Sequence, residues 1–101
     1  MRERIHIFHT NDLHSHFAYW KRSQYFIEQT RKMLAAQGET SFLIDLGDHL
    51  DRSNLVTEAT LGKCNIKMLN DANYDVVTLG NNEGITLAHD ELYHLYDDAR
   101  F

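Results

Sequence analysis

The chain has 101 residues, and ten Lys or Arg against fifteen Asp or Glu leave a formal charge of −5 with histidine neutral. This acidic balance argues against a binder of nucleic acid polymers, which needs a basic face to neutralise phosphates. Hydrophobic residues make up 43% of the chain, which is typical of one globular domain or part of one, and no stretch is apolar and long enough to cross a membrane.

Three β-prone segments lie along the chain, and each leads into a polar loop. The second and third are nearly continuous apolar runs that stop at Gly47 and Gly80. Runs of this kind are typical of strands in a parallel sheet that is covered on both faces. The predicted strands span residues 5–10, 42–46 and 75–79.

Helical patterns occupy the segments that follow each strand. Apolar side chains recur there at spacings of three and four residues. Thr57 and Thr86 stand where the N-caps of the second and third helices are expected. The predicted helices span residues 22–37, 57–72 and 87–99. The alternation of strand and helix predicts an α/β fold in which crossover helices join three parallel strands.

The loops after the three strands carry a set of potential metal ligands. Ligands of parallel sheets bind beyond the carboxyl ends of the strands, so these loops should converge on one rim. Asp12 and His14 are two residues apart, and in extended backbone their side chains would point the same way. A mixed shell of oxygen and nitrogen donors suits Mn²⁺, Fe²⁺, Zn²⁺ or Co²⁺. The candidate ligands are Asp12, His14, Asp48 and Asn81.

The order Asp-x-His, Gly-Asp, Gly-Asn resembles the calcineurin-like metallophosphoesterase superfamily. The longer stretch from His9 to His16, His-Thr-Asn-Asp-Leu-His-Ser-His, is similar to its 5′-nucleotidase (UDP-sugar hydrolase) branch. The resemblance implies that Asp12 and His14 bind one divalent metal ion, that Asp48 bridges two, and that Asn81 binds the second. It further implies hydrolysis of a nucleotide-like phosphate ester by a metal-bridging hydroxide.

One position departs from this pattern. The family motif is usually Gly-Asn-His-Asp/Glu, and here Asn82 occupies the place of the catalytic histidine. Asparagine can donate a hydrogen bond to phosphate but cannot act as a general acid. His16 and His49 are candidates to replace the histidine. The alternative is a non-catalytic relative that binds metal or phosphate in a regulatory role.

Asp45 lies inside an apolar strand, and two interpretations of it stay open. It could hydrogen-bond a ligating histidine from behind, as second carboxylates often do in metal sites. It could equally cap a neighbouring loop. A third possibility, besides the hydrolase and the non-catalytic relative, is a small flavodoxin-like domain. It is disfavoured because the chain has no Gly-rich phosphate loop.

The length also bears on function. The resemblance implies that residues 1–101 are the N-terminal half of a four-layer αββα sandwich, without the second half or the substrate-specificity domain. We therefore expect this piece to be inactive alone and to self-associate through exposed sheet surface. The single Cys64 excludes an intramolecular disulfide and suits a reducing compartment, so we expect a cytoplasmic location.

Overall fold

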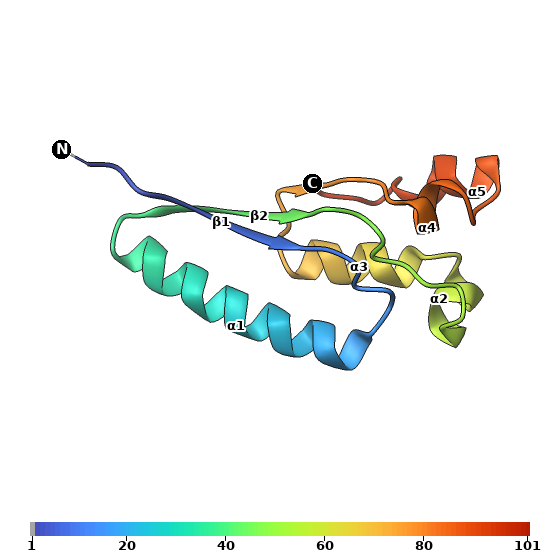
Figure 1. Ribbon diagram of the computed structural model, residues 1–101, viewed down its shortest axis with the longest axis horizontal. Helices are drawn as coiled ribbons and strands as arrows, with labels where there is room; N and C mark the ends of the chain where they lie inside the picture. Colours follow the sequence, from blue (N-terminus) through green and yellow to red (C-terminus); the bar gives the residue numbers. More distant parts are fainter. Residues whose placement is uncertain (1) are drawn as a thin grey trace.

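A computed structural model describes residues 2–101 of the chain (Figure 1). Three strands and five helices follow one another: β1 (Ile5–Thr10), α1 (Phe17–Ala36), β2 (Thr40–Asp45), α2 (Leu55–Thr60), α3 (Lys63–Asp71), β3 (Val76–Val77), α4 (Asn81–Gly84) and α5 (His89–Leu95). The strands form one sheet in the order β1-β2-β3, and both pairings are parallel. The predicted α/β fold with three parallel strands is therefore confirmed.

The register of the sheet brings the ends of β1 and β2 to the same level. Thr10 pairs with Asp45, the last residue of each strand. The β3 strand is shorter than the predicted segment 75–79. Its flanking residues still extend the ladder, because Asp75 donates from its backbone to Leu43 and Thr78 donates to Asp45, at 2.8 and 2.9 Å. All three strands thus deliver their following loops to one rim.

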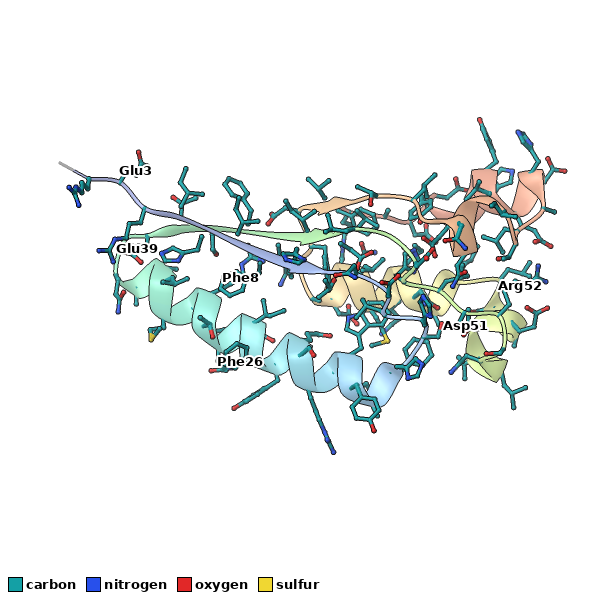
Figure 2. The ribbon with its side chains drawn as sticks, in the orientation of Figure 1. Glu3, Phe8, Phe26, Glu39, Asp51 and Arg52 are labelled. Atoms are coloured by element: carbon teal, nitrogen blue, oxygen red, sulfur yellow. The ribbon has the colours of Figure 1, made fainter. Side chains whose placement is uncertain are left out.

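In the described residues, 2–101, helices cover one face of the sheet and not the other. Figure 1 shows α1 and α3 on the same side of the strands. Phe8 lies on the inner face of β1 and packs against the core (Figure 2). The core joins this face to the helices through Trp20, Ile27, Leu43, Leu50, Ile66, Leu69, Tyr74, Leu87 and Leu95.

The opposite face of the sheet is apolar and open. Four of its side chains are between 42% and 64% exposed, namely Ile5, Ile7, Phe42 and Val76. Within residues 2–101 the sheet therefore has one covered face and one open face, which departs from the two covered faces typical of such strands and agrees with the exposed sheet surface expected for half of a sandwich. Apolar residues on both faces made the strands appear as continuous runs in the sequence, although helices cover just one face.

Helix boundaries differ from the sequence prediction. The helix expected over residues 57–72 is two helices, because Leu61 and Gly62 adopt left-handed torsions with φ of 51° and 84°. Asn54, not Thr57, caps α2 by accepting hydrogen bonds from two backbone amides. Likewise Ala88, not Thr86, precedes α5. The α1 helix starts five residues earlier than predicted, and α4 was not predicted. Within the described part of the chain, no helix combines the length and apolarity needed to cross a membrane.

Candidate metal centre

The loops after β1 and β2 are joined through their backbones. Three backbone bonds of 3.0–3.1 Å link the two loops beyond the sheet: Asp12 N to Gly47 O, His14 N to Asp48 O and Ser15 N to His49 O. Backbone bonds of this length fix two segments in register. Backbone hydrogen bonds therefore hold Asp48 and His14 beside each other, independently of any contact between their side chains.

Asp12, His14 and Asp48 form a compact group of potential ligands. One ligand atom from each lies within 4.8 Å of the others. His14 Nε2 is 3.6 Å from Asp12 Oδ1 and 3.9 Å from Asp48 Oδ2. These distances exceed those of hydrogen bonds. With metal–ligand bonds of about 2.0–2.2 Å, ligand atoms around one ion are about 3–4 Å apart. The spacing therefore fits a cation between the three side chains.

The imidazole of His14 gives a second indication. Its Nε2 is buried and has no hydrogen-bond partner among the described residues. A buried polar nitrogen without a partner is costly and calls for an explanation. Because this nitrogen faces two carboxylates, the residues fit a divalent cation, whose charge would also relieve the repulsion between Asp12 and Asp48.

The backbone at these residues is left-handed. Asp12, His14 and Asp48 have φ of 54°, 47° and 59°, and Ser15 has 55°. The expectation that Asp12 and His14 sit in extended backbone is therefore wrong; a tight loop brings them together. Each non-glycine residue in this region costs on the order of 1–3 kcal/mol and persists only where the surroundings hold it.

Two glycines allow the loops to approach. A Cβ on Gly80 would lie 2.5 Å from the backbone nitrogen of Asp48, and one on Gly47 would lie 2.8 Å from the nitrogen of Gly80. Gly47 also has φ of 105°. The glycines of the Gly-Asp and Gly-Asn pairs thus make room for main chain at the rim.

The third loop contacts Asp48 through Asn82. The Asn82 backbone N–H donates to Asp48 Oδ1 at 2.8 Å, which leaves Oδ2 toward His14. The side-chain amide of Asn82 donates to the Leu50 carbonyl at 2.9 Å. One of its two amide protons is thus used inside the protein, and at most one is left for a phosphate oxygen.

The fourth predicted ligand, Asn81, is exposed beside this contact. Its amide donates to Asn82 Oδ1 at 3.4 Å. Across residues 2–101, no hydrogen bond or ion pair joins the Asn81 side chain to Asp12, His14 or Asp48. The structure therefore gathers three of the four predicted metal ligands. Asn81 lies on the same rim, next to Asn82, whose backbone N–H contacts Asp48.

The two histidines considered as replacements for the missing one differ. His49 is fully buried, and its Nε2 lies 3.0 Å from the Tyr96 hydroxyl. Burial lowers the pKa of His49 to about 4, so it is neutral and turned into the core at neutral pH. His16 is exposed ahead of α1.

Asp51, in the loop before α2 (Figure 2), has its pKa lowered first by hydrogen bonds from Ser53 and more weakly by His14 and His16.

Asp45 caps a loop. Its carboxylate accepts hydrogen bonds from the Thr10 hydroxyl at 2.7 Å and from the Gly47 backbone at 3.0 Å. Burial raises the pKa of this carboxyl group. Of the two interpretations left open by the sequence, these contacts fit the second, in which Asp45 fastens the turn that begins the Gly47–Asp48 loop.

Sequence reasoning missed two buried polar features behind the rim. Ser15, Thr57 and Asn65 form a hydrogen-bonded network that joins the first loop to α2 and α3, with Ser15 Oγ 2.7 Å from Thr57 Oγ1. Glu83 is fully buried, and its carboxylate accepts a hydrogen bond from the Gly80 backbone, three residues earlier. The spacing of a glutamate at the third position of a helix could have signalled this cap.

Comparisons with known proteins agree with this geometry. Residues 5–101 match the family model described as calcineurin-like phosphoesterase. The whole chain is also 52% identical, over 101 residues, to a protein of Bacillus subtilis (strain 168) described as the uncharacterized metallophosphoesterase YunD. It spans about a fifth, 22%, of that relative's length. The chain therefore belongs to the calcineurin-like phosphoesterase family.

Proposed function

We propose that the chain carries one side of the metal centre of a phosphoester hydrolase. The observation that carries this proposal is the group of Asp12, His14 and Asp48, with the partnerless nitrogen of His14 directed at two carboxylates. In this proposal the three side chains hold a divalent ion, namely Mn²⁺, Fe²⁺, Zn²⁺ or Co²⁺. A divalent cation supplies Lewis-acid chemistry that neutralises phosphate charge and makes water more acidic.

The finer proposal is a dinuclear centre of the 5′-nucleotidase type acting on a nucleotide-like phosphate ester. It is supported by the stretch from His9 to His16 and by the place of Asn81 next to Asn82, whose backbone N–H donates to Asp48. In this arrangement Asp48 would be a ligand of both ions, and Asn81 would contribute to the second. Residues 1–101 would be the N-terminal half of the catalytic domain, inactive without ligands from elsewhere. A cytoplasmic location stays a prediction based on the single thiol of Cys64.

A second candidate function is binding without catalysis. Asn82 stands where the family has histidine, its amide is engaged with the Leu50 carbonyl, and the nearby His49 is buried. General acid catalysis typically contributes about 10²–10⁴-fold to rate, and neither residue can supply it in this arrangement. Such a protein would bind metal and phosphate and act in regulation.

The experiment that separates the two functions uses the full-length protein loaded with Mn²⁺, because residues 1–101 alone are proposed to be inactive. Hydrolysis of a chromogenic phosphodiester or a nucleoside monophosphate that Asp48→Asn abolishes would support the hydrolase. Tight Mn²⁺ binding without turnover, followed by turnover in Asn82→His, would support the binding function. Absence of Mn²⁺ binding would contradict both.

A further inference from the structure

Glu83 is a buried carboxylate with an unusual set of partners. It is fully buried in the first turn of α4, and within residues 2–101 no Lys, Arg or His forms an ion pair with it. Burying a carboxylate is costly unless hydrogen bonds compensate it. Its compensation comes from three backbone N–H groups, those of Asp48 at 2.8 Å, Gly80 at 2.9 Å and Leu50 at 3.2 Å.

The bond to Gly80 is an ordinary helix cap, but the other two are not local. Asp48 and Leu50 belong to the loop after β2, 35 and 33 residues earlier in the chain. Glu83 thus ties the loop that carries a proposed metal ligand to the start of α4. The carboxylate is the shared acceptor for both segments, since Oε1 serves Asp48 and Gly80 together.

These contacts determine how Asp48 presents its side chain. Its nitrogen is held by Glu83, and its Oδ1 accepts from the Asn82 backbone at 2.8 Å. The backbone nitrogen and Oδ1 of Asp48 are therefore both attached to α4, and Oδ2 is the oxygen left facing His14. Asp48 also holds a left-handed torsion, with φ of 59°, which needs support of this kind.

We propose that Glu83 is a positioning residue of the metal centre, which acts through Asp48 by holding its backbone so that Oδ2 faces the cation. This inference rests on the proposed function, since it assumes that Asp12, His14 and Asp48 bind the ion. Partners behind metal ligands typically change metal affinity by about 10–100-fold when they are substituted.

The test measures Mn²⁺ binding to the full chain by the loss of the spectrum of free Mn²⁺ in electron paramagnetic resonance. Glu83→Gln keeps the shape of the side chain, but its NH₂ group must face either the Leu50 N–H or the N–H groups of Asp48 and Gly80, so the loop that carries Asp48 loses part of its attachment to α4. We expect its Mn²⁺ dissociation constant to rise about 10-fold or more. The spectrum of the bound ion should also change, because Asp48 presents its oxygen differently.

Two matched variants separate positioning from simple destabilisation. Glu91 caps α5 by accepting from the Ala88 backbone at 3.0 Å, in the same local arrangement but without contact to a proposed ligand. Glu91→Gln should therefore bind Mn²⁺ as the parent does. Leu34→Ala weakens packing near the end of α1, which leads into the start of β2 at the far end of the strands from the rim, and its bound Mn²⁺ spectrum should match that of the parent.

The outcomes distinguish this inference from the proposed function. If the parent does not bind Mn²⁺, or if Asp48→Asn binds it equally well, the metal centre itself is refuted. If the parent binds and Asp48→Asn does not, while Glu83→Gln keeps the parental affinity and spectrum, the role of Glu83 is refuted and the centre stands. Should Glu83→Gln fail to fold, amide exchange in the metal-free parent decides: slow exchange at Asp48 and Leu50 is expected, and fast exchange at both overturns the proposal.

Discussion

Replacing Gly80 with alanine should damage the metal centre although no proposed ligand is itself substituted. The added Cβ would lie 2.1 Å from Asp48 Oδ1 and 2.5 Å from the Asp48 nitrogen, whereas ordinary contact begins at 3.4 Å, so Asp48 must retreat by about 1.3 Å. That movement stretches the 2.8 Å bond from Asp48 N to Glu83. Overpacking of this kind typically costs about 1–3 kcal/mol of stability.

The expected loss of metal affinity follows from the same displacement. A shift that misplaces one ligand oxygen should weaken Mn²⁺ binding by about 10–100-fold, which corresponds to about 1.4–2.8 kcal/mol. Isothermal titration with Mn²⁺ and urea unfolding of the metal-free protein measure the two effects separately. Gly84→Ala is the matched control, because its Cβ meets no heavy atom within 4 Å.

Two results would refute this reasoning. Parental Mn²⁺ affinity in Gly80→Ala would mean that the close approach at Asp48 does not set the ligand position. An equal loss in Gly84→Ala would mean that α4 is sensitive to any alanine, and that the contact at Gly80 has no special part.

Three further predictions concern the ligands, the buried carboxylate and the open sheet. His14→Ala and Asp48→Asn should each weaken Mn²⁺ binding by about 100-fold or more while a distant change such as Lys32→Ala does not; equal titration curves for all three would exclude the site. Burial raises the pKa of Asp45, so the folded state keeps that proton more tightly than the unfolded chain and stability falls as pH rises through the raised pKa. The free energy of unfolding of Asp45→Asn, relative to the parent, should therefore increase from about pH 4 to about pH 7 in urea titrations, and a constant difference would contradict this. Residues 1–101 alone should self-associate through the face of Ile7 and Phe42, and Ile7→Lys should reduce the effect; sedimentation that shows a monomer at all concentrations would disprove it.

The fold was predictable because its signals are local. The second and third apolar runs end at a glycine, and strand alternates with helix, which leaves few topologies for a parallel sheet. The division between α2 and α3 was missed because Ala59, Ile66 and Leu69 keep helical spacing across it. Gly62 was the signal, but the left-handed torsion of Leu61 depends on packing that periodicity does not report.

The site was predictable in its members more than in its geometry. Topology alone placed Asp12, His14 and Asp48 on one rim, and the structure gathers them there. The left-handed loop that brings Asp12 to His14 could not be inferred, since most residues avoid that conformation. The spacing could signal the bond of Glu83 to Gly80, but its bonds to Asp48 and Leu50 were out of reach, because these residues lie 35 and 33 positions earlier in the chain.

The backbone bonds between the first two loops have a kinetic consequence. Asp12, His14 and Asp48 already hold their strained torsions, and main-chain bonds of 3.0–3.1 Å keep the loops together. Little rearrangement of the chain is then needed when an ion arrives. The association rate should accordingly follow how fast each ion sheds its own hydration water, and it should differ between Mn²⁺ and slower-exchanging ions by the ratio of those rates.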